Sequence, residues 1–559
     1  MPKQRGADIL ARALARAGAK QLFSLSGNQI MPLYDAAIDA GLNIAHVRHE
    51  GAAVHMADAW GRLTGEPGIA LLTGGPGHAN GIGALYTALA SESPLVMLSG
   101  HAPLNQLGRG AFQEMAQADM AAPVTKASFI ARSAASLGED IARAMRIARG
   151  GRPGPVHLSL PFDVLEHTVE HTIERADACV PQADAFHAPV QPLAPDAAAG
   201  VLHALARAQR PLIICGPQLA SARGQTLRDQ LSAATGVAVV CMESPRGIAD
   251  PCLGAFGDVL PEADLIVLIG KQPDYTLRFA QPPAVNAQCR FIVIDADIAV
   301  LRQSLATLKC ERVVLNAVAD APAAMRNLIA AVDKNAIKTN GYAKFVTEAI
   351  AYRPVAWKSQ TATSPATVHA LEIGRAVQKI LDDADDPILV VDGGEFGQWA
   401  QACMSASTRI INGLAGSIGS AIPFAMAARA ARPNATVVAV LGDGTFGFHM
   451  AEFDTAVRHH LPFVAVVGND SCWNAEYQIQ LRTYGKARAT GCELLPGVAY
   501  EKAVAALGGH GERVTRAAEL PGALARSLKS TLPACINVMI ERMPAPTVSR
   551  MAAMVGSTH

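Results

Sequence analysis

Short runs of apolar residues alternate with longer amphipathic stretches along the whole chain. Runs of this length, bounded by glycine, proline or polar residues, predict buried strands, and the stretches between them have the spacing of helices. Strands that alternate with helices predict parallel sheets covered by helices. The expected fold class is therefore α/β, with mostly parallel sheets flanked by helices.

The predicted strands fall into three groups along the chain. They are expected at 21–25, 43–49, 69–74, 94–100 and 155–160, then at 211–216, 237–242, 265–270 and 291–297, and finally at 387–394, 436–444, 462–470 and 533–540. A stretch rich in proline and alanine at 181–195 indicates a linker, and a stretch of weak pattern at 333–365 separates the last two groups. The prediction is three α/β domains over residues 1–185, 190–340 and 365–559, each near the common domain size.

Composition limits the classes of protein that the chain can represent. With 559 residues it is too long for a single hydrophobic core. Half of the residues are apolar and only 17% are charged, which indicates a large interior or extensive subunit interfaces. The formal net charge is zero and no basic run occurs, which argues against a nucleic acid or an anionic membrane as a partner.

The sequence also predicts a cytoplasmic location. The N-terminus lacks the continuous apolar stretch of a signal peptide. No uncharged apolar run reaches the ~20 residues that a membrane span needs. The ten cysteines are scattered without a Cys-x-x-Cys pair, which favours reduced, buried thiols.

Candidate chemistry gathers at two strand ends in the last third of the chain. The strand predicted at 436–444 ends in Gly-Asp-Gly around Asp443, and the next predicted strand ends at Asp470. Glycines there let main-chain N–H groups approach an anion, and Thr445 can add a hydroxyl. A helix predicted at 446–460 would point its N-terminus at the same place. Because ligands bind at the carboxyl ends of parallel strands, these groups predict Mg²⁺ or Ca²⁺ bridging a diphosphate.

The spacing of these two strand ends resembles the motif of thiamine-diphosphate (ThDP) enzymes. Asp470 follows Asp443 by twenty-seven residues, close to the family's interval between Gly-Asp-Gly and a pair of asparagines. This chain departs from the family pattern because it has Asn469-Asp470 at the second place. The resemblance implies that Asp443, Asp470 and the main-chain carbonyl of Cys472 hold Mg²⁺. The additional negative charge leaves the affinity and the metal preference open.

Glu50 lies between a predicted strand and a predicted helix, where a glutamate most often favours the helix dipole. Its surroundings, NIAHVRHEGAAVHMADAWGRLTG, are similar to the pyrimidine-binding region of ThDP enzymes. The resemblance implies that Glu50 hydrogen-bonds the aminopyrimidine ring and so promotes loss of a proton from the thiazolium carbon. Partial burial is expected to tune the pKa of such a glutamate.

Four further stretches follow in the order of the family. They are TGGPGHAN at 73–80, GAFQEMAQADMAAPVTK at 110–126, VDGGEFGQW at 391–399 and NGLAGSIGSAIPFA at 412–425. The resemblance spans essentially the whole chain and is strongest to the acetolactate synthase and benzaldehyde lyase-like group. It implies that Gly416 supplies a carbonyl to the cofactor's amine and that Ile418 bends the cofactor. The full set of implied cofactor-binding residues is Asn80, Gly394, Glu395, Phe396, Gly416, Ile418, Gly442, Gly444, Thr445, Trp473 and Ala475.

Enzymes of this group make or break a carbon–carbon bond next to a carbonyl. The resemblance implies decarboxylation of a 2-oxo acid with carboligation, or lysis of a 2-hydroxy ketone, through an enamine intermediate. Gln113 is expected to orient a carbonyl, and Gln29 lies where the lyases commonly have histidine. Because glutamine is a poor proton donor, ligation is favoured over simple decarboxylation.

Three alternatives stay open. The chain could be a plain 2-oxo acid decarboxylase, a 2-hydroxyacyl-CoA lyase or oxalyl-CoA decarboxylase-like enzyme, or a catalytically silent homologue that binds the cofactor. The presence of both Glu50 and Asp443 argues against the silent homologue. A nucleotide-dependent oxidoreductase is disfavoured because no complete dinucleotide fingerprint follows the strand that ends at Gly216. Relatives hold FAD, ADP or nothing in the central domain, so the sequence leaves that nucleotide open.

The expected partners are small molecules and a second copy of the chain. Glu50 and Asp443 lie in different predicted domains, yet both must flank one cofactor. The resemblance implies that they meet across a dimer interface, in a homodimer or homotetramer. The expected substrates are 2-oxo acids, aldehydes or 2-hydroxy ketones.

Overall fold

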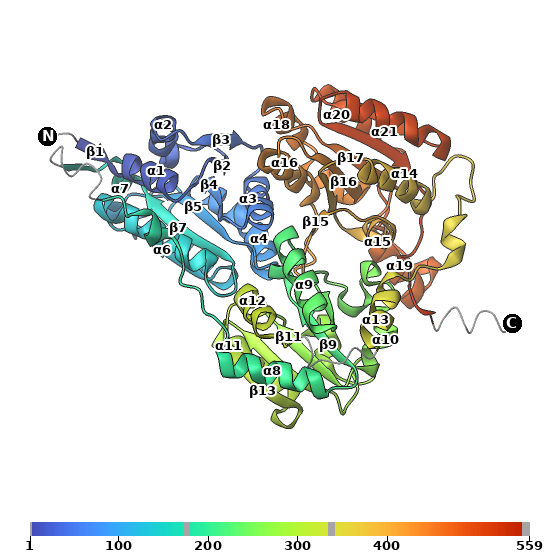
Figure 1. The fold of residues 1–559 in the computed structure, drawn as a ribbon. Coiled ribbons are helices and arrows are strands. Elements are labelled where there is room, and N and C mark those ends of the chain that lie inside the picture. The colour runs from blue at the N-terminus through green and yellow to red at the C-terminus, as the bar shows by residue number, and fades with distance from the viewer. Residues whose placement is uncertain (1–2, 171–178, 334–340, 551–559) are drawn as a thin grey trace.

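The computed structural model describes residues 3–170, 179–333 and 341–550, which form three parallel β-sheets flanked by helices (Figure 1). The N-terminal and C-terminal sheets have six strands each, and the central sheet has five. A separate antiparallel pair joins β1 (Lys3–Arg5) to β8 (Thr168–Glu170). The predicted α/β fold class is therefore confirmed. The last residues of the expected C-terminal domain, 551–559, lie outside the described part.

The N-terminal sheet has the strand order β3-β2-β4-β5-β7-β6, and all neighbouring pairs are parallel. Its strands are β2 (Gln21–Ser24), β3 (Asn43–His46), β4 (Gly68–Leu72), β5 (Leu95–His101), β6 (Ala127–Ile130) and β7 (Pro155–Pro161). Its helices are α1 (Gly6–Arg16), α2 (Met31–Asp39), α3 (Glu50–Thr64), α4 (Pro76–Ala90), α5 (Gln117–Ala121), α6 (Leu137–Arg149) and α7 (Phe162–Glu166). Parallel pairing places the carboxyl ends of all six strands at one edge, where α3 and α4 begin.

The C-terminal sheet repeats this topology, because its order is β15-β14-β16-β17-β19-β18 and each sheet runs second, first, third, fourth, sixth, fifth. Its strands are β14 (Pro387–Val391), β15 (Thr408–Ile411), β16 (Thr436–Gly442), β17 (Val464–Asn469), β18 (His510–Val514) and β19 (Ala534–Met539). Its helices are α14 (Ala370–Asp382), α15 (Gly394–Cys403), α16 (Ala421–Ala431), α17 (Asp443–His449), α18 (Glu452–Arg458), α19 (Asn474–Tyr484), α20 (Tyr500–Ala506) and α21 (Leu520–Lys529).

The central sheet has the order β10-β9-β11-β12-β13 and is also wholly parallel. Its strands are β9 (Pro211–Cys215), β10 (Ala238–Cys241), β11 (Leu265–Ile269), β12 (Arg290–Asp295) and β13 (Val313–Val318). The helices around it are α8 (Pro195–Arg207), α9 (Ala222–Thr235), α10 (Phe256–Val259), α11 (Ile298–Leu308), α12 (Ala321–Ala331) and α13 (Tyr342–Ala351). Its strand order reverses between β9 and β11, the place where open α/β sheets bind ligands.

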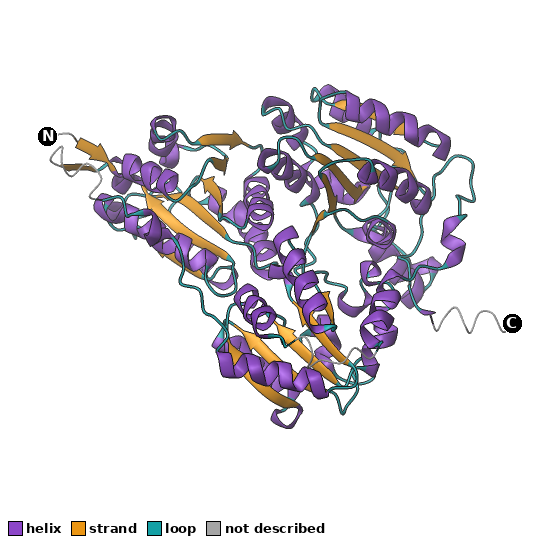
Figure 2. Ribbon diagram, viewed as in Figure 1, coloured by secondary structure: helices purple, strands orange, loops and turns teal. Residues whose placement is uncertain are grey.

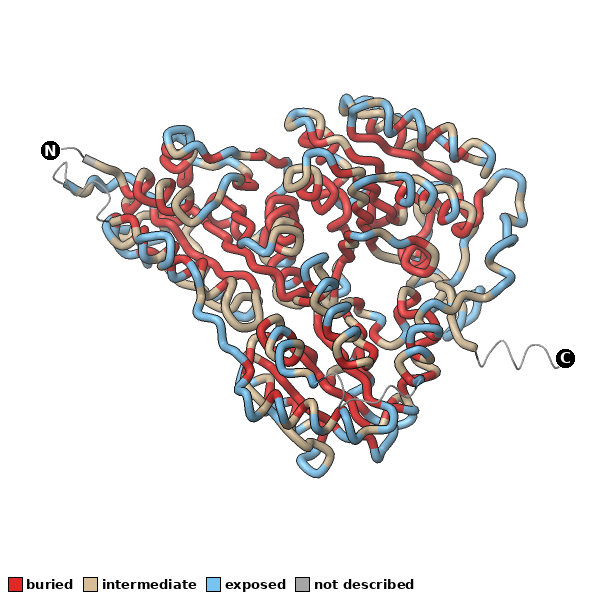
Figure 3. The backbone as a smooth tube through the Cα atoms, in the orientation of Figure 1, coloured by how far each residue is buried: buried red, intermediate tan, exposed pale blue. Residues whose placement is uncertain are grey.

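Helices cover both faces of each sheet (Figure 2), so inner strands such as β4, β9 and β11 are buried at every position (Figure 3). The N-terminal and C-terminal sheets also share one apolar cluster, because α3 packs against α16. Met56 of α3 and Phe424 of α16 are both fully buried in this cluster. The two outer sheets of one chain are therefore joined by a common core.

Several local expectations were wrong. The single helix predicted at 446–460 is two helices, α17 and α18, separated at Met450–Ala451. The stretch 333–365 contains α13, which packs on the central sheet. Strands β6, β13, β15 and β18 were missed; β6, β13 and β18 are half-buried along most of their length and lack a continuous apolar run.

The ten cysteines are all free, but only five of them are buried; four are half-buried and Cys310 is exposed. Within residues 3–170, 179–333 and 341–550, no helix is both long and apolar enough to cross a membrane. The domain boundaries and the cytoplasmic location stay predictions.

Candidate active site

A pocket opens at the carboxyl ends of β14, β16 and β17, which we call the carboxylate pocket. Asp443 directly follows β16 and Asp470 directly follows β17, and these two strands are parallel neighbours. The pocket is lined by Gly393, Gly394, Glu395, Phe396, Ile418, Gly442, Asp443, Gly444, Thr445, Gly468, Asp470, Cys472, Trp473, Asn474, Ala475 and Glu476. All the C-terminal residues predicted for the site are in this set except Gly416, which lies on the loop before α16.

The pocket places two carboxylates where water solvates them poorly. Asp443 is 2% exposed, and its Oδ2 is buried without a hydrogen-bond partner among the described residues. Burial raises the pKa of Asp443 to about 6. Burial, followed by the charge of Asp443, raises the pKa of Asp470 to about 7. A cation between the two side chains would relieve both desolvation and repulsion, so the residues fit a hard divalent ion.

Glycines give this pocket room for an anion beside the carboxylates. A Cβ at Gly394, whose φ is +69°, or at Gly442 would point into open space. A Cβ at Gly444 would instead lie 2.7 Å from the ring of Trp473. The main chain can therefore approach a ligand at the first two positions, and the third must be glycine because Trp473 packs against it. This arrangement fits a diphosphate group held beside the cation.

Asp392 supports the pocket, although sequence reasoning did not select it. Its Oδ2 accepts hydrogen bonds from the main-chain N–H of Gly419 at 2.9 Å and of Ala421 at 3.0 Å. These bonds fix the loop that carries Ile418 into the pocket. Its place directly after an apolar strand, in VDGGEF, was the available signal.

A second group of predicted residues meets at the carboxyl edge of the N-terminal sheet, which we call the glutamate cluster. Glu50 is the first residue of α3 and is 9% exposed. Its Oε2 accepts a hydrogen bond of 3.0 Å from Nδ2 of Asn80 on α4. A Cβ at Gly77 would lie 3.3 Å from Oε1 of Glu50 and 2.6 Å from Cγ2 of Thr73. The first turn of α4 therefore packs against the carboxylate.

Gln29 and Gln113 join the same cluster through Thr73. The hydroxyl of Thr73 donates to Oε1 of Gln29, and Nε2 of Gln29 donates to Oε1 of Gln113 at 2.8 Å. Gln29 is 4% exposed, whereas Gln113 is half-buried with a φ of +58°. This order of bonds leaves the amide Nε2 of Gln113 available as a donor. Thr73 was not predicted as a site residue, although it opens the motif TGGPG.

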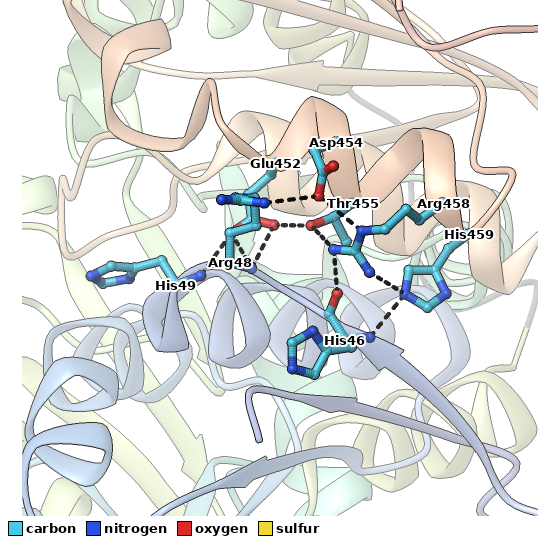
Figure 4. A network of polar contacts seen from close by, with 8 residues as sticks. All are labelled: His46, Arg48, His49, Glu452, Asp454, Thr455, Arg458 and His459. Carbon is cyan, nitrogen blue, oxygen red and sulfur yellow. Dashed lines mark hydrogen bonds and ion pairs between the residues drawn. The ribbon is translucent and has the colours of Figure 1, made fainter. Parts of the chain in front are cut away.

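The turn before Glu50 is held by the C-terminal part of the same chain (Figure 4). Glu452, at the start of α18, is 1% exposed and accepts hydrogen bonds from the main-chain N–H of His49 at 3.0 Å and of Arg48 at 3.1 Å. Thr455 donates its hydroxyl to the same carboxylate at 2.6 Å. A neighbouring contact joins the N–H of His46 to Nε2 of His459 at 3.0 Å. The C-terminal region thus holds the main chain of the two residues that precede Glu50, and so helps to position Glu50.

Within one chain the two groups remain separate. None of Glu50, Asn80, Gln29 and Gln113 lines the carboxylate pocket in the part of the chain that the structure describes. Both groups lie at carboxyl ends of parallel strands, but of different sheets. A single ligand that contacts both would need surfaces from two chains or a rearrangement of one.

The crevice between β9 and β11, where a nucleotide would bind the central sheet, holds charged side chains, and a cavity of about 610 Å³ lined by Glu92 and by Pro217 to Gly224 opens beside them. Glu92, which belongs to the N-terminal region and is 6% exposed, accepts a hydrogen bond of 3.3 Å from the N–H of Gln218, just after β9. Arg152 bridges Glu92 and the buried Asp295 at the end of β12. A Cβ at Gly216 would lie 2.1 Å from the carbonyl oxygen of Gly270. These contacts engage the N–H of Gln218 and the guanidinium of Arg152, while the cavity beside them stays open.

Two models of known protein families match the regions that contain the glutamate cluster and the carboxylate pocket. The model for the N-terminal TPP binding domain of thiamine pyrophosphate enzymes matches residues 4–120. The model for the C-terminal TPP binding domain matches residues 392–538. The chain belongs to the ThDP-dependent enzymes, of the acetolactate synthase and 2-hydroxyacyl-CoA lyase type.

Individual relatives match over nearly the whole chain. The chain is 30% identical to a probable acetolactate synthase of Mycobacterium bovis over 542 residues, which covers 95% of each protein. It is 28% identical to a 2-hydroxyacyl-CoA lyase of Oryza sativa subsp. japonica, over 98% of this chain and 97% of the rice protein. It is 28% identical to human 2-hydroxyacyl-CoA lyase 2, over 92% of this chain and 85% of the human protein.

Proposed function

We propose that this chain is a ThDP- and Mg²⁺-dependent enzyme that makes or breaks a carbon–carbon bond next to a carbonyl. Its substrates would be small 2-oxo acids, aldehydes or 2-hydroxy ketones. The observation that carries this proposal is the pair Asp443 and Asp470 in one pocket beside open main chain, where Asp443 is buried with an unpartnered carboxylate oxygen and Asp470 is half-buried. The cytoplasmic location remains a prediction.

In this proposal the carboxylate pocket holds the cation and the diphosphate. Asp443 and Asp470 supply side-chain oxygens, and the main-chain carbonyl of Cys472 supplies a third ligand. The described residues include no group of three His, Cys, Asp or Glu side chains that could hold a metal. The remaining ligands would therefore come from the main chain and from the diphosphate itself.

The glutamate cluster would act on the other end of the cofactor. When bound, ThDP supplies a carbon that adds to a carbonyl and stores the electrons released on bond cleavage. Glu50, held by Asn80, would share a proton with the aminopyrimidine ring. Gln113, oriented by Gln29, would donate its Nε2–H to the carbonyl oxygen of the substrate. Neither glutamine titrates, which favours joining a second carbonyl compound over simple protonation.

The separation of the two groups favours an active site built from two subunits. Glu50 of one chain would face a cofactor whose diphosphate is bound by Asp443 and Asp470 of the other chain. The assembly would be a homodimer, or a homotetramer made of two such dimers. The shared core between α3 and α16 would keep each chain rigid while it serves both sites.

The proposal is tested by cofactor binding and by a substrate screen. Asp443→Ala should weaken ThDP binding in calorimetry with Mg²⁺ present. Glu50→Gln should bind ThDP but lose turnover of every substrate that the wild type accepts. Unchanged ThDP affinity in Asp443→Ala, or an active Glu50→Gln variant, would contradict the assigned roles. Products of pyruvate, aldehydes and 2-hydroxy ketones, identified by mass, would separate ligation from lysis and from plain decarboxylation.

A second candidate is cleavage of a 2-hydroxyacyl-CoA. Three observations favour including it: the rice, human and Arabidopsis thaliana relatives that align over most of this chain are named 2-hydroxyacyl-CoA lyases. The screen should therefore contain a 2-hydroxyacyl-CoA thioester beside the matching free acid. Turnover of the thioester alone would replace the carboligase assignment.

We also propose that the central sheet binds neither FAD nor ADP. Glu92 takes the N–H of Gln218, a donor that a phosphate would need, and Arg152 is engaged by two carboxylates. The central region would instead serve as a rigid support for the N-terminal sheet.

A further inference from the structure

The carboxylate pocket poses a charge problem that the family pattern does not have. Where ThDP enzymes usually have asparagine, this chain has Asp470. Two aspartates cancel the charge of a divalent cation, whereas one aspartate and one asparagine leave the cation with a net positive charge. The cofactor's diphosphate is an anion, so the second aspartate removes the attraction that would hold it.

Arg542 lies beside the loop that carries Asp470. Its Nε donates to the main-chain carbonyl of Asp470 at 2.9 Å, and its Nη2 donates to the carbonyl of Ser471 at 3.1 Å. The guanidinium also lies over the ring of Tyr477, 5.5 Å from its centroid. These contacts hold a permanent positive charge against the residue that departs from the family pattern.

The surroundings of Arg542 leave much of that charge effective. Its Nη1 pairs with Glu493 at 2.9 Å, but the Glu493 side chain is 69% exposed while that of Arg542 is 30% exposed. Water screens the exposed carboxylate more strongly than it screens the half-buried guanidinium. Ser471, which Arg542 contacts, is buried and has a φ of +55°, so the loop approaches the guanidinium in a fixed conformation.

We propose that Arg542 is a positioning residue that restores the positive charge which Asp470 removes from the cation site. It would act on the diphosphate through this charge and on the loop from Asp470 to Cys472 through its bonds to two carbonyl groups. This inference rests on the proposed function, because it assumes that Mg²⁺ and ThDP bind in the carboxylate pocket.

A purely mechanical brace is the competing explanation, and the two explanations differ in what they predict. If Arg542 only braces the loop, its loss harms binding whichever residue stands at position 470. If it balances charge, its loss is harmful with Asp470 and nearly harmless with asparagine there. A lysine at position 542 keeps the charge but loses the forked contact, so it separates the two explanations again.

The experiment is calorimetric titration of ThDP into apo protein at saturating Mg²⁺, with no turnover required. The variants are Arg542→Gln, Arg542→Lys and Asp470→Asn, the double variant Asp470→Asn with Arg542→Gln, and Asp470→Asn with Arg542→Lys. Arg526→Gln is the matched control, because its guanidinium is 61% exposed and pairs with Glu512 outside the pocket. Glu493→Gln is a further control that removes the pairing partner but leaves Arg542.

Charge balance predicts that Arg542→Gln raises the Kd for ThDP about tenfold, equivalent to about 1.4 kcal/mol. Arg542→Lys should raise it only about twofold, and the double variant should return to within about threefold of the wild type. Arg526→Gln and Glu493→Gln should not weaken binding. Equal losses from Arg542→Gln in the wild-type and Asp470→Asn backgrounds, or no loss in either, would overturn the proposal.

Two controls keep the result interpretable. Circular dichroism and melting temperature report whether each variant folds. If Arg542→Gln does not fold, Arg542→Lys still separates the two explanations when it is tested with aspartate and with asparagine at position 470. A mechanical brace predicts a large loss of ThDP affinity in both cases, and charge balance predicts a small loss in both. A wild type that binds no ThDP would refute the proposed function, whereas a wild type that binds it without this coupling would refute only the role of Arg542.

Discussion

Glu452 is the clearest test of how the C-terminal region positions Glu50. Its carboxylate accepts the N–H groups of Arg48 and His49, the two residues that precede Glu50 (Figure 4). Glu452→Gln keeps the shape of the side chain but removes the charge and one of its two acceptor oxygens. The amide NH₂ would then face a main-chain N–H or the hydroxyl of Thr455.

The size of the effect follows from these contacts. A hydrogen bond to a charged group contributes about 1.5–3 kcal/mol, and a buried N–H left unpaired costs about 1–3 kcal/mol. Burial raises the pKa of Glu452, so the charged form is itself costly and offsets part of this gain. We expect Glu452→Gln to destabilise the turn at 46–49 by about 2 kcal/mol after that offset.

Two measurements check this expectation. Hydrogen exchange should rise by more than about tenfold in the peptide that covers residues 46–55, and kcat should fall by about tenfold while the Kd for ThDP stays near the wild-type value. Asp454→Asn is the matched control on the same helix, since its pairs with Arg48 and Arg458 are partly exposed and should contribute less than about 1 kcal/mol. Unchanged exchange and kcat in Glu452→Gln would refute the role of this contact.

Three further predictions concern the nucleotide, pH and product choice. Denatured wild-type protein should release no flavin or adenine nucleotide, and added FAD or ADP should leave its melting temperature unchanged; a flavin absorption spectrum would contradict the proposal that Glu92 and Arg152 exclude a nucleotide from the central sheet. Burial raises the pKa of Asp392 to about 6 from the ordinary value of 3.8. The folded state therefore favours the protonated carboxyl, so this group does not reduce the free energy of unfolding below pH 3.8, and it reduces it increasingly as pH rises through about 6. Asp392→Asn should therefore gain up to about 3 kcal/mol relative to the wild type as pH rises from about 3.5 to about 7, measured by denaturant unfolding at each pH, and a constant difference would be inconsistent with this pKa. Gln29→His should increase the share of protonated over ligated product from a 2-oxo acid, and an unchanged product ratio would show that residue 29 does not control proton supply.

The sequence predicted the inner strands and their parallel arrangement because those strands are apolar at nearly every position and alternate with helices. β9 and β11 are examples, since helices on both faces leave no solvent-exposed side. The edge strand β13 was missed because its apolar run is interrupted by the polar, exposed Asn316, and its other residues are only half-buried. The break between α17 and α18 was missed because the apolar spacing continues through Met450. Neither a proline nor a glycine stands at the break, which falls at Met450 and Ala451.

Site residues could be predicted from the sequence where several chemical groups stand together at the end of one predicted strand. Asp443 and Asp470 could be paired from their places after neighbouring strands, and the structure puts both in one pocket. Strand ends alone did not lead to four further residues, because each acts through main-chain or side-chain contacts that form only in the folded chain. They are Thr73, Asp392, Glu452 and Arg542. Thr73 and Asp392 do stand in the motifs TGGPG and VDGGEF, whereas only the three-dimensional contacts distinguish Glu452 and Arg542.

If the active site is divided between two subunits, two inactive variants should restore activity when they are mixed. Glu50→Gln and Asp443→Ala should each be inactive as pure proteins. In a mixed dimer, the intact Glu50 of one chain would face the intact Asp443 of the other, so one of the two sites is complete. Random mixing after dissociation and reassembly should restore about a quarter of wild-type activity, because about half of the dimers are mixed and each has one complete site. If both residues served a cofactor bound within one chain, every site in the mixture would carry a defect and no activity would return.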